Sequence, residues 1–352
     1  MGKRVAITGI GVSICNHGLN GEDELKAFKN RKIKKLLSGG EKFFCSSAIS
    51  AVHDSGILDA HTAKEKRGIF LGTTKESSSR MELLNVLKSI YDGEIRYPEF
   101  PEAVVGNMSP LFVVKSLPNA CLHYGAEEFD IRGSNSLFIT NGAAGSQAIA
   151  AAYHSVKRED CIWCLAGGFD SHMEEDEFYN YEQYGFKIAD SPDEKSSKTL
   201  SEGAGSLIVE DYDHAVSRKA KIYGEIIGHG EVFLDLENNQ EENAVILKRG
   251  ILKSLAMANK NAEEIDFIHT DGLAYRNYNE MEEKAVQDIF SDTPRIDLKK
   301  RFGNLMGAAS VVEIAADLNT GLRPGIALET FMKISAGFGG EVSIMIIRRN
   351  EL

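Results

Sequence analysis

Residues 137–156, LFITNGAAGSQAIAAAYHSV, join a short apolar run, an Asn-Gly turn and a segment rich in small residues. The apolar run is typical of a buried strand, and the segment after the turn has the pattern of a helix. A strand that turns sharply into a helix holds the side chain at its apex at the positive helix end, facing a substrate. Gly142 occupies that apex. The pattern therefore predicts an α/β fold with a strand–turn–helix elbow of the kind that carries a catalytic nucleophile. Here the apex residue is a glycine, which has no nucleophilic side chain.

Strand-like runs alternate with helical patterns along the chain. Five such runs lie before residue 212, and a second series begins near residue 220. This alternation favours a mostly parallel sheet covered by helices. The two series have a similar order of patterns and meet between residues 213 and 219. We therefore predict two related halves, residues 1–215 and 216–352.

Composition and charge narrow the class of protein. The 352 residues are 43% hydrophobic, which is enough for a large core, and the formal net charge is −12. An acidic chain is poorly suited to nucleic acid, whose binding depends on neutralised phosphates. No run approaches the roughly 20 uncharged apolar residues of a membrane span, and the first residues lead into a strand-like run without a secretory pattern. We expect a cytoplasmic protein that binds neither nucleic acid nor membrane.

Five cysteines are scattered along the chain. An odd, scattered set is not a secreted disulfide framework, so reduced thiols are expected. Cys161 and Cys164 have the spacing of redox motifs, but they lie in an apolar run, where cysteines more often act as small apolar residues of a buried strand. No further Cys or His pair has zinc-site spacing, and no metal is expected. The five are Cys15, Cys45, Cys121, Cys161 and Cys164.

A helix is predicted over residues 77–91. Four apolar residues recur there at helical spacing, which predicts a face turned toward the core. Three prolines between residues 92 and 116 indicate irregular structure before the SPLFVV segment. The four residues of the predicted core face are Met81, Leu84, Leu87 and Tyr91.

Five blocks in order carry a resemblance to a known family. The elbow is followed by LAGGFDS at 165–171 and SEGAGSLIVED at 201–211, with AITGIG near the start and SAGFGGEVSIMI near the end. Their order and spacing resemble those of the β-ketoacyl synthases, and five blocks together are specific where one would be weak. The resemblance implies a thiolase-like α/β fold, whose two related βαβ-rich halves form a five-layer α-β-α-β-α arrangement, and it implies no cofactor.

Active members of that family carry a Cys in a T-A-C-A-x-G pattern, a His in H-G-T-x-T and a second His in K-x-x-x-G-H-x-x-G-A-A. At these positions the chain has Gly142, Asp271 and Asn304, while Lys299 is retained. His269 lies two residues before Asp271, but moving it into the histidine position would break the match that follows. Gly cannot be acylated, an anionic Asp repels an enolate, and Asn cannot shuttle a proton. The resemblance thus implies that condensation by the family's mechanism is lost.

A ketosynthase-like chain without its nucleophile resembles the chain length factor, the β subunit of the ketosynthase in type II polyketide synthases. The resemblance implies a heterodimer with a catalytic, Cys-bearing ketosynthase, an acyl carrier protein that reaches the complex, and a growing polyketide chain held in a shared tunnel. Strand pairing across the dimer through residues 136–140 is expected on the same ground. Gly142 departs from the Gln of the familiar members, and the chain is shorter than theirs.

The resemblance also suggests which residues shape the tunnel. Residues 80–91 correspond by position to a helix that lines it, which makes Met81, Leu84 and Phe112 candidates, with ordinary core packing as the competing interpretation. The GFGG turn matches the loop whose aromatic residue gates the acyl pocket in active relatives. With no cysteine behind it, this loop is interpreted as structural. Its residues are Gly337, Phe338, Gly339 and Gly340.

Two other functions remain open from the sequence. The chain could be an active acyltransferase or condensing enzyme of the same fold with another nucleophile, for which Ser146 is a candidate that lacks a matched histidine to activate it. It could also be a non-catalytic protein that binds acyl carriers without a ketosynthase. The basic run at 295–301 fits an acidic carrier protein, although such runs are more often solvated surface.

Overall fold

The computed structural model describes residues 3–15, 36–74, 81–112, 117–171, 181–182, 185–188, 198–237, 240–272, 278–320 and 330–350. The strands are β1 (Val5–Ile14), β2 (Arg67–Thr73), β3 (Asn135–Ile139), β4 (Trp163–Asp170), β5 (Lys187–Ile188), β6 (Thr199–Leu200), β7 (Gly203–Asp211), β8 (Gly224–Phe233), β9 (Phe267–His269), β10 (Arg295–Ile296), β11 (Thr330–Ala336) and β12 (Glu341–Arg349). The helices are α2 (Gly39–Ser55), α3 (Met81–Ser89), α4 (Phe100–Asn107), α6 (Ala120–Phe129), α7 (Ala144–Lys157), α9 (Tyr212–Ser217), α10 (Gln240–Ala258), α11 (Tyr278–Gln287), α12 (Lys299–Phe302) and α13 (Ala309–Thr320).

Two half-sheets with the same topology make up the main sheet. The first has the order β3-β2-β4-β7-β1 and the second β10-β9-β11-β12-β8. In each, the first three strands are parallel and the last two run antiparallel to their neighbours. The half-sheets join where β1 pairs with β8 over Ala6↔Glu225 and Ile7↔Gly224. The predicted division after residue 215 falls within α9, between β7 and β8, and stays a prediction.

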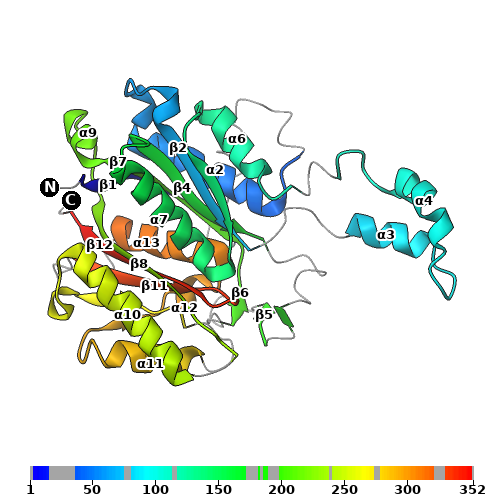
Figure 1. Ribbon diagram of the computed structural model, residues 1–352. Helices are drawn as coiled ribbons and strands as arrows, with labels where there is room; N and C mark the ends of the chain where they lie inside the picture. Colours follow the sequence, from blue (N-terminus) through cyan, green and yellow to red (C-terminus); the bar gives the residue numbers. More distant parts are fainter. Residues whose placement is uncertain are drawn as a thin grey trace.

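Helices form three layers around the two half-sheets. α2 and α6 cover the outer face of the first half-sheet, α10 and α11 cover that of the second, and α7 and α13 lie between them (Figure 1). Each interface has its own apolar cluster, and the central one joins Tyr153 of α7 and Ile314 of α13 to both half-sheets. The layers follow the order α-β-α-β-α, which confirms the predicted thiolase-like α/β fold.

Local sequence signals fix the ends of α2. Ser38 accepts a hydrogen bond from the backbone N–H of Glu41, and the Glu41 carboxylate accepts one from the Ser38 N–H, which together form a capping box. At the other end, Gly56 has φ 60°, the left-handed conformation that closes many helices. α2 is thereby held at a defined length against β1, β7 and β4.

The α3–α4 arm, residues 81–107, projects away from the layered body (Figure 1). α3 packs against α4, and the buried side chains on this part of the chain are Val86 and Ile90. The predicted core face is therefore wrong: Leu84 is 39% exposed and Tyr91 60% exposed. The spacing identified a helix over 81–89 correctly, but it could not reveal that, among the described residues, α3 packs chiefly against α4 and lies outside the layered body.

The region between residues 92 and 116 is more regular than predicted, because it contains α4. Pro98 lies in the first turn of the short 3-10 helix Tyr97–Glu99, and Pro101 lies in the first turn of α4. A proline in a first turn removes an N–H that has no partner within the helix anyway, so these prolines are compatible with helix formation.

Candidate functional site

The predicted elbow is present between the first half-sheet and the central helix layer. β3 ends at Ile139, a 3-10 turn covers Asn141–Ala143, and α7 begins at Ala144. Asn141 adopts φ 50°, a left-handed conformation that Asn tolerates better than most side chains. The Thr140 hydroxyl donates to the side-chain oxygen of Gln147 at 2.5 Å, which ties the turn to the second turn of α7. The elbow is an ordered part of the fold.

The space for a side chain at the apex of the elbow is already filled. A Cβ placed on Gly142 would lie 2.4 Å from the carbonyl oxygen of Ala336, at the end of β11. The approach is reciprocal, because a Cβ on Gly337 would lie 2.4 Å from the carbonyl oxygen of Thr140. Real Cβ contacts are not this short, so a side chain at either position requires the backbone to shift. Glycine is present at the apex because β11 packs directly on it.

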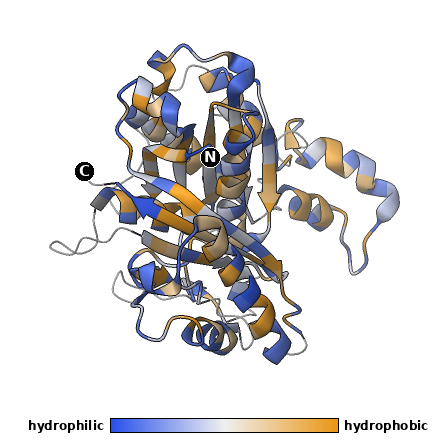
Figure 2. Ribbon diagram, turned by 60° about the vertical axis from the view of Figure 1, so that its left-hand side comes forward, coloured by the Kyte–Doolittle hydropathy of each residue, from blue (hydrophilic) through white to orange (hydrophobic). Residues whose placement is uncertain are grey.

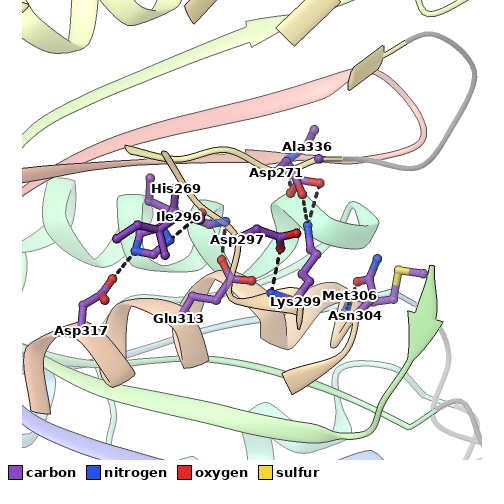
Figure 3. A network of polar contacts seen from close by, with 12 residues as sticks. His269, Asp271, Ile296, Asp297, Lys299, Asn304, Met306, Glu313, Asp317 and Ala336 are labelled. Carbon is purple, nitrogen blue, oxygen red and sulfur yellow. Dashed lines mark hydrogen bonds and ion pairs between the residues drawn. The ribbon is translucent and has the colours of Figure 1, made fainter. Parts of the chain in front are cut away.

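Asp271, at the first histidine position, faces the elbow. Its Oδ2 lies 3.8 Å from the Cβ position of Gly142 and accepts the backbone N–H of Ala336 at 3.1 Å. Its Oδ1 accepts Lys299 Nζ at 3.0 Å, and the same ammonium group also donates to the Asp271 carbonyl oxygen (Figure 3). Asp271 and Lys299 are 4% and 2% exposed. The carboxylate is thus engaged on both oxygens.

The charges around Lys299 favour its ammonium form. Burial lowers the pKa of Lys299, but the carboxylates of Asp271 and Glu313 outweigh it and raise the pKa above its ordinary value. Glu282 accepts the backbone N–H groups of Asp271 and Gly272, both at 2.9 Å, and so fixes the loop that carries Asp271. Burial, together with the charge of Asp271, raises the pKa of Glu282 to about 7. Asp271 and Lys299 therefore form a buried ion pair on a rigid support.

His269 points away from the elbow. It ends β9, and its Nδ1 donates to the carbonyl oxygen of Ile296 at 3.2 Å, while its Nε2 forms a short hydrogen bond with the Asp317 carboxylate (Figure 3). Burial raises the pKa of Asp317. These two bonds tie His269 to the backbone at Ile296 and to α13. The structure brings Asp271, and not His269, to Gly142.

Asn304, at the second histidine position, holds a turn. Its Oδ1 accepts the backbone N–H of Met306 at 3.0 Å, and Met306 has φ 47° (Figure 3). The Asn304 backbone bridges to the strand beside it, since its N–H donates to Thr199 and its carbonyl accepts from Ser201. An Asn supplies the acceptor that this strained turn needs.

Gly337 of the GFGG loop contacts the elbow at Thr140, and Ala336, just before the loop, contacts it at Gly142. The sequence motifs did not single out Ala336. Phe338 packs instead on Phe186 and Tyr181, with ring centroids 5.8 and 6.4 Å apart. Gly339 is exposed, and Gly340, at φ 102°, closes the turn between β11 and β12. The sequence pattern could not have identified Ala336, because its role depends on which backbone oxygen of β11 meets the elbow.

Ser146, the alternative nucleophile, points into the central layer. It is fully buried, and its hydroxyl is 2.9 Å from the hydroxyl of Ser343 on β12. Ser343 in turn lies 3.5 Å from His229 Nε2, and His229 Nδ1 lies 3.2 Å from His154 Nε2. Burial lowers the pKa of His229 to about 4, so this histidine is neutral near pH 7. The row of polar groups links α7 to β12 and β8 behind the elbow.

The candidate tunnel residues lie on or near the arm. Leu84 is on α3, and Phe112 follows α4 and is half-buried. Met81 begins α3, but its side chain lies outside the described part of the structure. In the described residues no three His, Cys, Asp or Glu side chains are grouped to hold a metal ion, and no helix there is long and apolar enough to cross a membrane.

Comparison with known proteins decides the family. The family model for the β-ketoacyl synthase N-terminal domain matches residues 23–215, more than half of the chain. The chain belongs to the β-ketoacyl synthase family. A mitochondrial 3-oxoacyl-[acyl-carrier-protein] synthase of Arabidopsis thaliana is 24% identical over 226 residues, which cover 58% of this chain and 49% of the relative. The chain thus spans about half the length of this β-ketoacyl synthase.

Solved structures share the fold over the full length of the β-ketoacyl synthase chain. A structure described as the ishigamide ketosynthase/chain length factor superposes with a TM-score of 0.78 at 20% identity and covers 100% of both chains. A type II polyketide synthase acyl-carrier protein in complex with its ketosynthase bound to the hexaketide, AntDE:AntF, gives a TM-score of 0.79 at 19% identity, again with 100% of both chains covered. At these identities the likeness establishes the ketosynthase fold.

Proposed function

We propose that this chain is a catalytically inactive ketosynthase homologue that acts as a chain length factor. It pairs with a Cys-bearing ketosynthase and forms part of the tunnel that limits the length of a polyketide. The observation that carries the proposal is the contact between Gly142 and Ala336: the place of the nucleophile is occupied by backbone. A condensing enzyme needs that place for a thiolate and for the acyl group that the thiolate accepts.

The ion pair beside the elbow supports the same function. Active relatives use an imidazole at the position of Asp271 to polarise the malonyl thioester. Here the position carries a carboxylate, which is tied to Lys299 and to the Ala336 N–H and cannot donate a hydrogen bond to a thioester oxygen as an imidazole N–H does. A negative charge there also disfavours an enolate. The three replaced positions therefore work together as a structural core and not as a weakened active site.

The exposed surface supports a partner that covers it. Leu83 and Leu84 on α3 are each 39% exposed, and Tyr91 just beyond the helix is 60% exposed, so the arm carries uncovered apolar side chains. Figure 2 shows apolar and polar residues interspersed along both helices of the arm. β3 is the last strand of its half-sheet, and Ile139 at its end is 48% exposed. An uncovered edge strand and an apolar arm together favour a subunit interface.

A carrier protein is the second proposed partner. One relative in fold is a ketosynthase in complex with a type II polyketide synthase acyl-carrier protein. Within the basic run at 295–301, Lys299 is buried and Arg295 pairs with Glu283. The exposed cations that remain are Lys300 and Arg301 on α12. They could attract an acidic carrier, but only two charges of the run are available for it.

Co-expression with a Cys-bearing ketosynthase and its carrier protein tests the proposal. We expect a 1:1 complex of the two ketosynthase-like chains and carrier-bound products of defined length by mass spectrometry. Leu84→Ala enlarges the proposed tunnel and should lengthen these products. Covalent uptake of labelled malonyl or acyl groups by this chain alone would instead identify an active enzyme. If this chain forms a homodimer that binds the carrier protein and does not bind the ketosynthase, it is a carrier-binding protein.

A further inference from the structure

Two cysteines share one small space between β2, β4 and the start of β3. A Cβ on Gly68 would lie 2.7 Å from Cys164 Sγ and 3.0 Å from Cys161 Sγ. Gly68 and Cys164 are register partners on adjacent strands, and a bend at Ile162 turns Cys161 back over the same glycine. Both sulfur atoms thus occupy the volume that a side chain on β2 would otherwise fill. This convergence is not required by the spacing of a strand, in which residues three apart point to opposite faces.

The two thiols differ in character. The neighbouring Cys164 thiol favours charge on the Cys161 sulfur and, together with Ser155 and Ser134, lowers the pKa of Cys161 to about 6 despite burial. Burial and the neighbouring sulfur raise the pKa of Cys164 well above its ordinary value. Near neutral pH the pair therefore contains a thiolate beside a thiol, which is the arrangement of a nucleophilic and a resolving cysteine.

The pair lies close to a surface turn. Cys161 is 2% exposed but directly follows residues 158–160, which are exposed, and Glu159 in that turn has φ 64°. The Cys161 N–H donates to the Ser155 carbonyl oxygen at 3.3 Å, a long bond at the end of α7. A peroxide therefore reaches the pair through a local opening of this turn.

We propose that Cys161 and Cys164 form a reversible dithiol–disulfide site that reacts with a peroxide. The Cys161 thiolate attacks one peroxide oxygen, the O–O bond breaks, and Cys161 becomes a sulfenic acid as the other oxygen leaves and takes up a proton to form water. The Cys164 sulfur then attacks the Cys161 sulfur, the S–O bond breaks, and the departing hydroxide takes the Cys164 proton as a second water. The two sulfurs lose two electrons and the peroxide gains them.

The fold supplies a matched control. Cys45 on α2 and Cys121 on α6 are also buried near each other, but the pKa of each is raised, chiefly by burial. They lack the thiolate that starts the reaction. Cys15, which is more exposed than the other four, serves as the reference for simple accessibility.

The test uses the full-length, reduced wild-type chain in hydrogen peroxide without denaturant, followed by alkylation of free thiols and peptide mapping by mass spectrometry. We expect a Cys161–Cys164 cross-link, lighter by two hydrogens, to form roughly tenfold or more faster than any change at Cys45 or Cys121, and to be reversed by dithiothreitol. Cys164→Ser should stop the reaction at a Cys161 sulfenic acid that dimedone captures, whereas Cys161→Ser should leave Cys164 unmodified.

Two results would overturn the site. One is a wild-type chain whose Cys161 and Cys164 are both alkylated as free thiols after Cys15 is fully oxidised. The other is a cross-link that appears only when urea unfolds the chain. The reaction would then arise from the closeness of the two cysteines in the sequence and not from their arrangement in the folded structure. Both measurements use the wild-type chain, so neither depends on whether a cysteine variant folds.

Discussion

The carbonyl oxygen of Ala336 lies 2.4 Å from the position that a Cβ on Gly142 would take. This contact is one of those that join the two half-sheets, because Gly142 belongs to the elbow after β3 and Ala336 ends β11. Asp271 lies beside both and accepts the Ala336 N–H, so the position of the oxygen is fixed by the buried pair with Lys299. The space beside Gly142 is therefore filled by the backbone of β11, which Asp271 holds in place.

Gly142→Ala should destabilise the chain by about 1–3 kcal/mol, since the added methyl must displace the backbone of β11 or of the elbow. Chemical denaturation of the isolated chain measures this loss. Gly106→Ala is the matched control, because nothing lies within 4 Å of a Cβ at that helical position. The control should be neutral or slightly stabilising, as expected for Ala in a helix. Equal behaviour of the two variants would contradict the close contact.

Lys299→Met should lower the free energy of unfolding by about 3–5 kcal/mol, because it leaves the Asp271 carboxylate buried without its cation. Lys260→Met is the control, since Lys260 pairs with Glu264 at the surface and should change stability by about 0–1 kcal/mol. Urea titration compares the two. If Lys299→Met costs no more than the control, the pair does not hold the site together.

His229 should make stability depend on pH between about 4 and 6.5. Its pKa is lowered to about 4, first by burial and then by His154 and Lys253, so the folded state binds fewer protons in this range than the unfolded state. The contribution is therefore fully present above pH 6.5 and is lost as the pH falls toward 4, by about 3 kcal/mol. His229→Asn should remove that part of the pH dependence in parallel unfolding titrations. If the free energy of unfolding depended on pH equally in wild type and variant, His229 would not titrate as described.

Leu84→Glu should prevent co-purification with a ketosynthase partner and leave the melting temperature of the chain alone unchanged, because the side chain is uncovered in the isolated subunit. Val245→Glu introduces the same charge at a residue that is 44% exposed on α10, on the other side of the molecule. Pull-down of the co-expressed pair distinguishes them. An intact complex with Leu84→Glu would place the interface elsewhere.

Much of the fold follows from the sequence, as periodicity and the five motif blocks suggest. The strand, Asn-Gly turn and helix around Gly142 occur where the pattern predicts them, and the duplicated strand order agrees with two related series of elements. These features depend on local pattern and chain order, which a sequence displays directly. Proline was misleading between residues 92 and 116, because its effect depends on whether it falls in the first turn of a helix or later.

The details of the site could not be predicted in the same way. Leu84 and Val86 are both apolar residues of one helix, and only the position of α4 decides that Val86 is buried and Leu84 is not. Phe338 matches a motif, yet the contact with Gly142 comes from the backbone carbonyl of Ala336. A backbone contact of this kind cannot be predicted from the type of residue at position 336. Likewise, the spacing of Cys161 and Cys164 did not indicate that a glycine on a neighbouring strand makes room for both sulfurs.

The location of the acyl group in a reconstituted complex tests the central claim most directly. The chain, a Cys-bearing ketosynthase and an acyl-loaded carrier protein are mixed, and intact mass spectrometry records which subunit gains the acyl mass. The account predicts that the ketosynthase alone becomes acylated and that this chain keeps its unmodified mass. An acyl adduct on this chain, whether at Ser146 or at any other residue, would contradict it.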